Sequence, residues 1–275
     1  MKPSQAMASD STPPVLEEQI PEELMKTGHS HWLGAVVLFV CLIGVWELSV
    51  RGFAVSPHFL PSPSAIALEF ANLFDLLFSH LAVTLLEVYI GFGIAAVVGI
   101  VLAVLVDFSP WLRAIIQPYI IVLQATPKIA LAPFIVIWFG FGIPSKIATA
   151  AIISFFPIFI NALAGFVSTS RHVIDLMTVL RAKEHQIMWK AKFPHALPYI
   201  FAGFEIGILL SLIGAIVGEF VSSTAGLGYL IANFNHQLKT AAAFAALLML
   251  AIFGILSFGI IIWLKRRIVF WLGKI

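Results

Sequence analysis

The stretch VSTSRHVIDLMTVLRAKEHQIMWKAKFPHA, residues 167–196, interrupts the long apolar runs of this chain. Its charged residues and histidines are Arg171, His172, Asp175, Arg181, Lys183, Glu184, His185, Lys190, Lys192 and His195. In a chain with only 11% charged residues, a long basic insertion has no evident use unless a molecule in the aqueous phase docks there. We therefore predict that this polar island, residues 167–196, is a partner-binding site.

Apolar residues inside the polar island recur at helical spacing, with the charges on the other side. They form one stripe of Val173, Leu176, Met177 and Leu180 and a second of Ile187, Met188 and Ala191. The pattern predicts two short amphipathic helices with a bend over residues 182–186. The island closes on Phe193-Pro194-His195-Ala196-Leu197-Pro198, for which we expect a rigid corner.

The composition places the rest of the chain in a lipid bilayer. Apolar residues make up 60% of the sequence and the mean hydropathy is +1.02, whereas an ordinary soluble domain has about 25% charged residues. A spanning helix needs about 20 apolar residues. The runs that meet this requirement are 32–50, 84–106, 114–140, 147–166, 197–220 and 241–264. We predict an all-α polytopic bundle of about six spans.

The distribution of Lys and Arg predicts the orientation, because cytoplasmic loops carry an excess of both residues. An N-terminus inside the cell leaves Arg51, Lys146 and Lys239 outside and Lys128 within a span. The other twelve are then inside: Lys2, Lys26, Arg113, Arg171, Arg181, Lys183, Lys190, Lys192, Lys265, Arg266, Arg267 and Lys274. Both termini and the polar island are therefore expected in the cytoplasm.

The first thirty residues are too acidic and too rich in proline for a secretory signal sequence. We expect residues 1–30 to be a disordered cytoplasmic tail and residues 31–275 to form one membrane domain. Cys41 is the single cysteine, so no internal disulfide can form. The net charge of +2 gives no support to nucleic-acid binding, and the scattered histidines indicate no metal site.

Glycines in two spans predict close helix packing, since small residues let backbones approach where lipid provides no hydrophobic driving force. One set is Gly91, Gly93 and Gly99, and the other is Gly203, Gly207, Ser211, Gly214 and Gly218.

The predicted span 114–140 contains Pro118, Pro127 and Pro133, each of which frees a backbone carbonyl that lipid cannot satisfy. This span should therefore line the interior. The candidate pathway residues are Gln124, Pro127, Lys128, Asn161 and Glu219. Lys128 could attract an anion, or it could pair with a carboxylate or extend to water.

Glu219 has two interpretations, because a charge inside a span is a functional candidate by default. It could lie at an outer gate or at a seam between subunits. Alternatively, it could be an interfacial carboxylate that reaches water and caps residues 221–224. Gly226-Leu227-Gly228 predicts a turn before a short outer helix, since no Lys and Ser or Thr follow as in a phosphate-binding loop.

The polar island resembles the cytoplasmic EAA loop of permease subunits from binding-protein-dependent ABC importers. The resemblance rests on Asp175-Leu176-Met177, Arg181, Phe193-Pro194 and Leu197-Pro198. Asp175 stands where the family usually has Glu, Met177 where it has the second Ala, and Arg181 where it commonly has Gly. The resemblance implies that residues 167–196 are the coupling loop that sits in a groove of the ATPase. The implied coupling residues are Asp175, Leu176, Met177, Leu180, Arg181, Ala182, Lys183, Glu184, Pro194, Leu197 and Pro198.

Further motifs extend the resemblance over residues 58–270 and are similar to the nitrate, sulfonate and taurine branch of these permeases. They are residues 60–63 (LPSP), 126–128 (TPK), 138–142 (WFGFG), 156–161 (FPIFIN), 218–220 (GEF) and 226–230 (GLGYL). The resemblance implies a type I ABC importer permease fold and a homodimer with two ATPase subunits and an extracytoplasmic solute-binding protein. It also implies that the membrane is a bacterial inner membrane. The solute would be small, either anionic or similar to a vitamin precursor.

The sequence contains no Gly-x-x-x-x-Gly-Lys-Ser/Thr motif, so the chain would bind no ATP itself and need no cofactor. The main alternative is an ion-coupled secondary transporter. Such a protein would need repeated halves and acidic or polar ion ligands near the midplane, and neither is evident in the sequence. An intramembrane enzyme would need a catalytic pair within the spans. His80, His172, His185, His195 and His236 all fall at span ends or in loops, which disfavours it.

Overall fold

The computed structural model describes residues 30–272, so the expected N-terminal tail lies almost entirely outside the described residues. The chain divides into two compact units, Met1–Ser49 and Val50–Ile275. The described part of the first unit belongs to helix α1, Ser30–Gly52, which contains an apolar span over Gly34–Gly52.

The fold is all-helical, as predicted. The helices of the second unit are α2 (Pro63–Asn72), α3 (Phe74–Phe108), α4 (Pro110–Ala125), α5 (Ala132–Phe139), α6 (Ile143–Val167), α7 (Arg171–Val179), α8 (Glu184–Ile187), α9 (Phe193–Ser222), α10 (Leu227–His236) and α11 (Thr240–Ile268). Within residues 30–272, five helical stretches are long and apolar enough to cross a membrane. They correspond to the predicted spans 32–50, 84–106, 147–166, 197–220 and 241–264.

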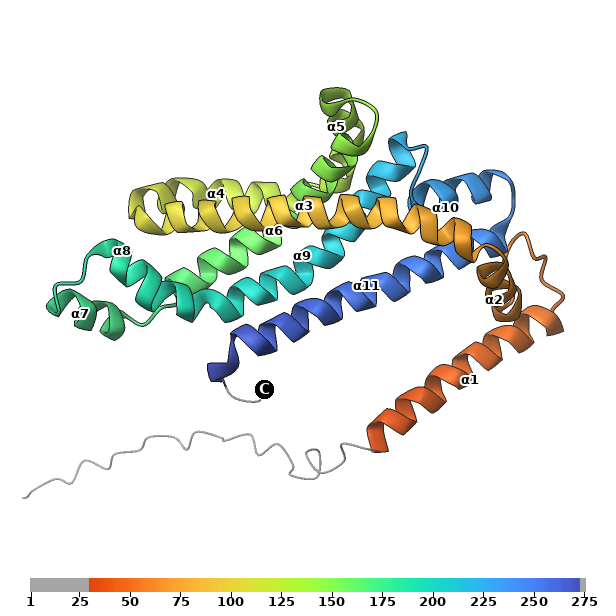
Figure 1. Ribbon diagram of the computed structural model, residues 1–275, viewed down its shortest axis with the longest axis horizontal. Helices are drawn as coiled ribbons and strands as arrows, with labels where there is room; N and C mark the ends of the chain where they lie inside the picture. Colours follow the sequence, from red (N-terminus) through yellow and green to blue (C-terminus); the bar gives the residue numbers. More distant parts are fainter. Residues whose placement is uncertain (1–29, 273–275) are drawn as a thin grey trace, which may run out of the picture. The chain divides into compact units, whose positions relative to one another are not determined.

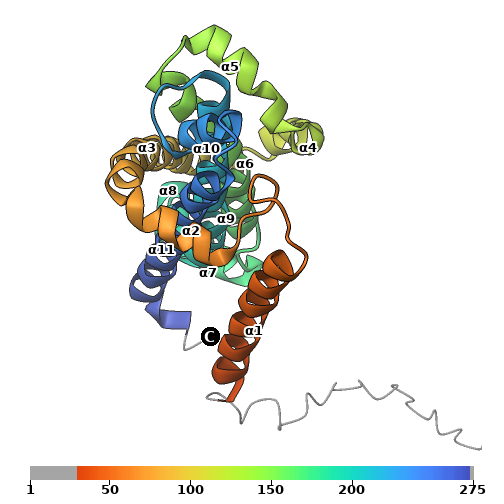
Figure 2. The ribbon, with the colours of Figure 1, turned by 90° about the vertical axis from the view of Figure 1, so that its right-hand side faces the viewer.

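The long helices α3, α6, α9 and α11 run between two ends of the second unit (Figure 1). Helices α7 and α8 lie at one end, which is called the α7 end, and α2 and α10 lie at the other, the α10 end (Figure 1). The last residues of α11 also lie toward the α7 end (Figure 1). Figure 2 shows α4 and α5 on the opposite side of the unit from α11.

The predicted span 114–140 is divided between two α-helices at one of its three prolines, Pro127. Helix α4 ends at Ala125 because Thr126, which precedes Pro127, adopts an extended conformation with ψ of 130°. A short 3₁₀ helix over Lys128–Leu131 and then α5 continue the path. Gln124 and Lys128 therefore do not belong to one α-helix.

The core of the second unit is α6, which packs along α3 on one side and along α9 on the other. A Cβ added to Gly91 of α3 would lie 2.7 Å from Cβ of Ala150, and one added to Gly214 of α9 would lie 2.7 Å from Cα of the same residue. Ile158 is enclosed in the same way. A Cβ added to Gly99 would lie 3.2 Å from its Cγ2, and one added to Gly203 would lie 3.1 Å from its Cα. The predicted glycine packing is confirmed for these positions. Gly93 is the exception, since an added Cβ would meet nothing within 4 Å.

Substituting Gly214 by Leu should destabilise the core, because the new side chain would collide with the backbone of α6. Overpacking of this kind costs about 1–3 kcal/mol or more. Gly93→Leu, on the open side of α3, is the matched control. The measurement is the thermal stability of each purified variant in detergent. Equal melting temperatures for both variants would contradict the proposed close approach.

Candidate functional site: the polar island and two buried polar clusters

The polar island forms a helical hairpin at the α7 end (Figure 1). Helix α7 is followed by a chain reversal, the short helix α8 and a π-helical turn over Met188–Lys192 that continues directly into α9. The expected rigid corner at residues 193–198 is absent, because Pro194 and Pro198 both lie inside the first turns of α9. Pro194 is at the start of α9, and Pro198 is inside the helix, where it removes one backbone hydrogen bond without ending the helix. The hairpin is thus joined to a spanning helix without a hinge.

Helix α7 exposes large apolar side chains although charged residues surround them. The exposed fractions are 60% for Leu176, 79% for Val179 and 72% for Leu180, while Met177 is half-buried. By contrast, Met188 on the returning segment is only 1% exposed. The first predicted stripe is therefore largely exposed on α7, whereas the second is anchored in the core at Met188.

The reversal after α7 depends on Arg181, whose φ of +56° lies in the left-handed region. The N–H of Arg181 donates to the Thr178 carbonyl and the N–H of Ala182 to the Met177 carbonyl, both at 2.9 Å. This pair of bonds is a Schellman motif, which usually has glycine at the left-handed position. The position is the one where the sequence resemblance places a family glycine, and Arg there costs about 1–2 kcal/mol. The bend lies at residues 180–183, slightly before the predicted range.

The start of α8 is stabilised by a side chain from within that helix. The N–H of Lys183 donates to Oε1 of Gln186 at 2.9 Å. This bond satisfies one of the backbone amides that have no partner in the first turn of a helix.

A buried ion-pair cluster joins the polar island to the ends of α3 and α4. The Asp107 side chain is 0% exposed, and its Oδ1 accepts from Nη2 of Arg113 at 2.5 Å while its Oδ2 accepts from Nζ of Lys192 at 2.6 Å. These three residues are called the Asp107 cluster. Sequence reasoning missed it because Lys192 is 85 positions away from Asp107, which follows a long apolar run. Its one local signal is the Asp-Phe-Ser-Pro sequence, in which Ser109 caps α4 by accepting from the N–H of Leu112 at 3.2 Å.

A second buried cluster, the Glu219 cluster, holds the turn before α10. Oε1 of Glu219 accepts from the Thr84 hydroxyl at 2.7 Å, and Oε2 accepts from the N–H of Gly228 at 2.5 Å. Thr84 in turn accepts from the N–H of Leu227 at 2.9 Å. Glycine is required at Gly226 because its φ is +110° and an added Cβ would collide with the Glu219 carboxylate. The predicted turn and the short helix after it are therefore confirmed.

Glu219 itself is only 1% exposed, so it does not reach water or cap residues 221–224. That alternative was wrong because the carboxylate is occupied by Thr84 and Gly228. Nearby, Lys146 lies 3.3 Å from Oε1 of the fully buried Glu87 and donates to the Ser223 hydroxyl at 2.6 Å. Lys146 is 3% exposed and belongs to the first turn of α6.

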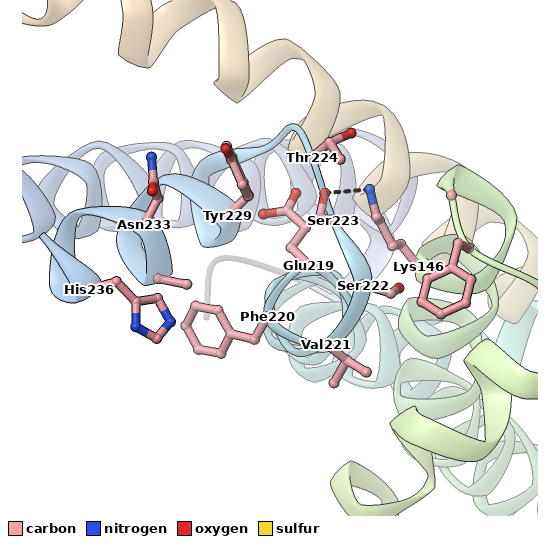
Figure 3. A pocket seen from close by; sticks show the side chains of 13 residues that line it. Lys146, Glu219, Phe220, Val221, Ser222, Ser223, Thr224, Tyr229, Asn233 and His236 are labelled. Atoms are coloured by element: carbon pink, nitrogen blue, oxygen red, sulfur yellow. Dashed lines mark hydrogen bonds between the residues drawn. The ribbon is translucent and has the colours of Figure 1, made fainter.

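A pocket of about 530 Å³ opens beside this second cluster. Figure 3 shows Glu219 and Lys146 at its wall, with Tyr229, Asn233 and His236 contributed by α10. Phe220 adds an aromatic surface. The pocket has both polar and apolar side chains in its lining, and it lies at the α10 end.

The structure does not bring all the candidate pathway residues together. Gln124 and Pro127 are exposed around the break after α4, and Nζ of Lys128 lies 3.3 Å from the Gln124 carbonyl and 4.9 Å from the Phe156 ring centroid. Asn161 donates to the Pro157 carbonyl of its own helix at 2.8 Å. Glu219 belongs instead to the cluster at the α10 end. Within residues 30–272, no three His, Cys, Asp or Glu side chains gather as metal ligands.

The sequence matches known transport proteins over most of its length. A family model described as "Binding-protein-dependent transport system inner membrane component" matches residues 95–270. The formylaminopyrimidine transport permease protein ThiX of Halalkalibacterium halodurans is 34% identical over 243 residues, which cover 88% of this chain and 97% of that protein. The taurine transport system permease protein TauC of Escherichia coli is 30% identical over 242 residues, which cover 85% of this chain and 88% of that protein.

A solved amino acid ABC transporter structure with histidines shares the fold, with a TM-score of 0.58 and 20% identity over 73% of this chain and 97% of that one. The fold and the family inferred from the sequence motifs are thereby confirmed. The family is one of transport subunits that are not themselves catalytic. The chain belongs to the binding-protein-dependent transport system inner membrane components, the permease subunits of ABC importers.

Proposed function

We propose that this chain forms the translocation pathway of an ATP-driven importer for a small solute, either anionic or similar to a vitamin precursor. The relatives named for formylaminopyrimidine and taurine transport motivate this solute class. We further propose that two copies of the chain assemble with two ATPase subunits and an extracytoplasmic solute-binding protein. ATP would be bound by the ATPases, since this sequence contains no phosphate-binding motif.

The main support for this proposal is the exposed apolar surface of α7 and its C-terminal end. Leu176, Val179 and Leu180 lie among charged residues at the α7 end, so lipid does not account for their exposure. Apolar side chains surrounded by polar residues are typical of a protein interaction site. In the proposed mechanism, closure of the ATPases displaces residues 175–190 of both copies. The continuous helix from the π-helical turn into α9 then transmits the displacement to the spans.

Replacing Leu176 and Leu180 together by Asp should release the ATPase from the permease. An ionised carboxylate buried without a partner costs more than about 2 kcal/mol, which corresponds to a loss of affinity of more than about tenfold. The measurement is the amount of ATPase that co-purifies with the tagged permease. Thr178→Asp, which changes the opposite side of α7, is the control and should retain the ATPase. Full co-purification of the ATPase with the double variant would contradict the proposal that this surface binds the ATPase.

We propose that the α7 end faces the cytoplasm. The basic residues Arg171, Arg181, Lys183 and Lys190 and those at the end of α11 support this orientation.

Single cysteines test the orientation in a Cys41→Ala background, since both Arg171 and Lys239 are exposed. In intact spheroplasts, a membrane-impermeant thiol reagent should label Lys239→Cys and leave Arg171→Cys unmodified. Permeabilised membranes provide the control, because both cysteines should then react. Labelling of Arg171→Cys alone in spheroplasts would reverse the orientation.

We propose that the break between α4 and α5 lines the pathway, because a helix interrupted at membrane depth must face protein or water. Gln124→Cys and Lys128→Cys should therefore react with a small water-soluble thiol reagent, at rates that change when ATP is added to the assembled complex. Val97→Cys is the control, since Val97 is 64% exposed on the apolar surface of α3. If Val97→Cys reacts and responds to ATP while the other two stay inert, the pathway lies elsewhere.

A further inference from the structure

The Asp107 cluster connects α3, α4 and the π-helical turn of the polar island. Asp107 lies in the last turn of α3, Arg113 in the first turn of α4, and Lys192 at the end of the π-helical turn that precedes α9. The side chains of Arg113 and Lys192 are 31% and 19% exposed, whereas that of Asp107 is fully buried. One buried carboxylate thus holds two cations from different segments in fixed positions.

Apolar packing connects the same segments. Met188 lies in a buried cluster with Ala103 and Val106 of α3, and Leu112 and Ile116 of α4 pack against that cluster. The polar and the apolar contacts together tie the returning arm of the polar island to the beginning of α4. They provide a route from the polar island to α4 that does not pass through α9.

Helix α4 leads directly from this cluster to the proposed pathway. It begins after the Ser109 cap and ends at Ala125, next to Gln124 and the break at Thr126–Pro127. A displacement at the Arg113 end would therefore shift the break. Ion pairs with charge-assisted hydrogen bonds at 2.5 and 2.6 Å have a defined direction, which apolar packing lacks.

We propose that Asp107 is a positioning residue that couples movement of the polar island to movement of α4, because its carboxylate binds both Arg113 and Lys192. This inference rests on the proposed function, because it assumes that an ATPase moves the island. A merely structural role would predict that loss of the cluster lowers the amount of folded protein and leaves the coupling of the remaining protein unchanged. A positioning role predicts assembled complexes that hydrolyse ATP without moving α4.

The experiment compares Asp107→Asn and Arg113→Met with the wild type in the complete complex, each carrying Gln124→Cys in the Cys41→Ala background. Two quantities are measured: solute transported per ATP hydrolysed, and the change in thiol reactivity at position 124 on addition of ATP. Both variants should retain the ATPase and its hydrolysis, while the transport ratio falls by about tenfold and the reactivity at position 124 no longer responds to ATP. Arg113→Lys keeps the cation and should restore most of the response.

Asp75→Asn is the matched control, because it removes an exposed carboxylate from the first turn of the same helix and should behave like the wild type. Arg113→Met keeps the Asp107 to Lys192 pair, so it tests the proposal even if Asp107→Asn does not accumulate. Wild-type values of both quantities in Arg113→Met would overturn the proposal. A wild-type complex without ATPase binding or ATP response would instead contradict the proposed function.

Discussion

The close approach of α6 to both α3 and α9 is the constraint on which the rest of the structure depends. Ala150 meets Gly91 on one side and Gly214 on the other, and Ile158 meets Gly99 and Gly203 in the same way. In lipid, helices gain little hydrophobic free energy from association, so contact depends on backbones that can come close together. The three helices consequently form one packed element, and the polar clusters are built at its two ends.

Both clusters place charged groups where helices of this packed element end. At the α10 end Thr84, Glu87, Lys146 and Glu219 come from all three helices, and at the α7 end Asp107 collects cations from outside the element. A buried ion pair contributes little net stability, because removing both charges from water offsets most of their attraction. The directional bonds of each cluster instead fix the position of a neighbouring segment, the Gly226–Gly228 turn at one end and the start of α4 at the other.

Periodicity and composition were sufficient to predict five spans, the glycine packing and the two-part polar island, because each depends on residues close together in sequence. The sequence did not reveal the Asp107 cluster, since Asp107 and Lys192 are separated by 85 positions. It also missed the exact reversal after α7, where Arg181 takes the left-handed position without the glycine that normally marks it. Leu238 does the same after α10, with a φ of +57°. The prolines of the predicted span 114–140 did not locate the break by themselves, because Pro118 lies inside α4 whereas the helix ends before Pro127.

The polar island combines an exposed apolar surface with a buried anchor, and this combination has a mechanical consequence. Leu176 and Leu180 are free to contact a partner, while Met188 and Lys192 on the returning arm are held in the core. The Schellman reversal at Arg181 and the short helix α8 leave little flexible chain between the two parts. A force applied to α7 would therefore reach the core through backbone hydrogen bonds instead of being absorbed by a loop. The π-helical turn at Met188–Lys192, a type of irregularity found often at functional sites, lies at the point where that force would enter α9.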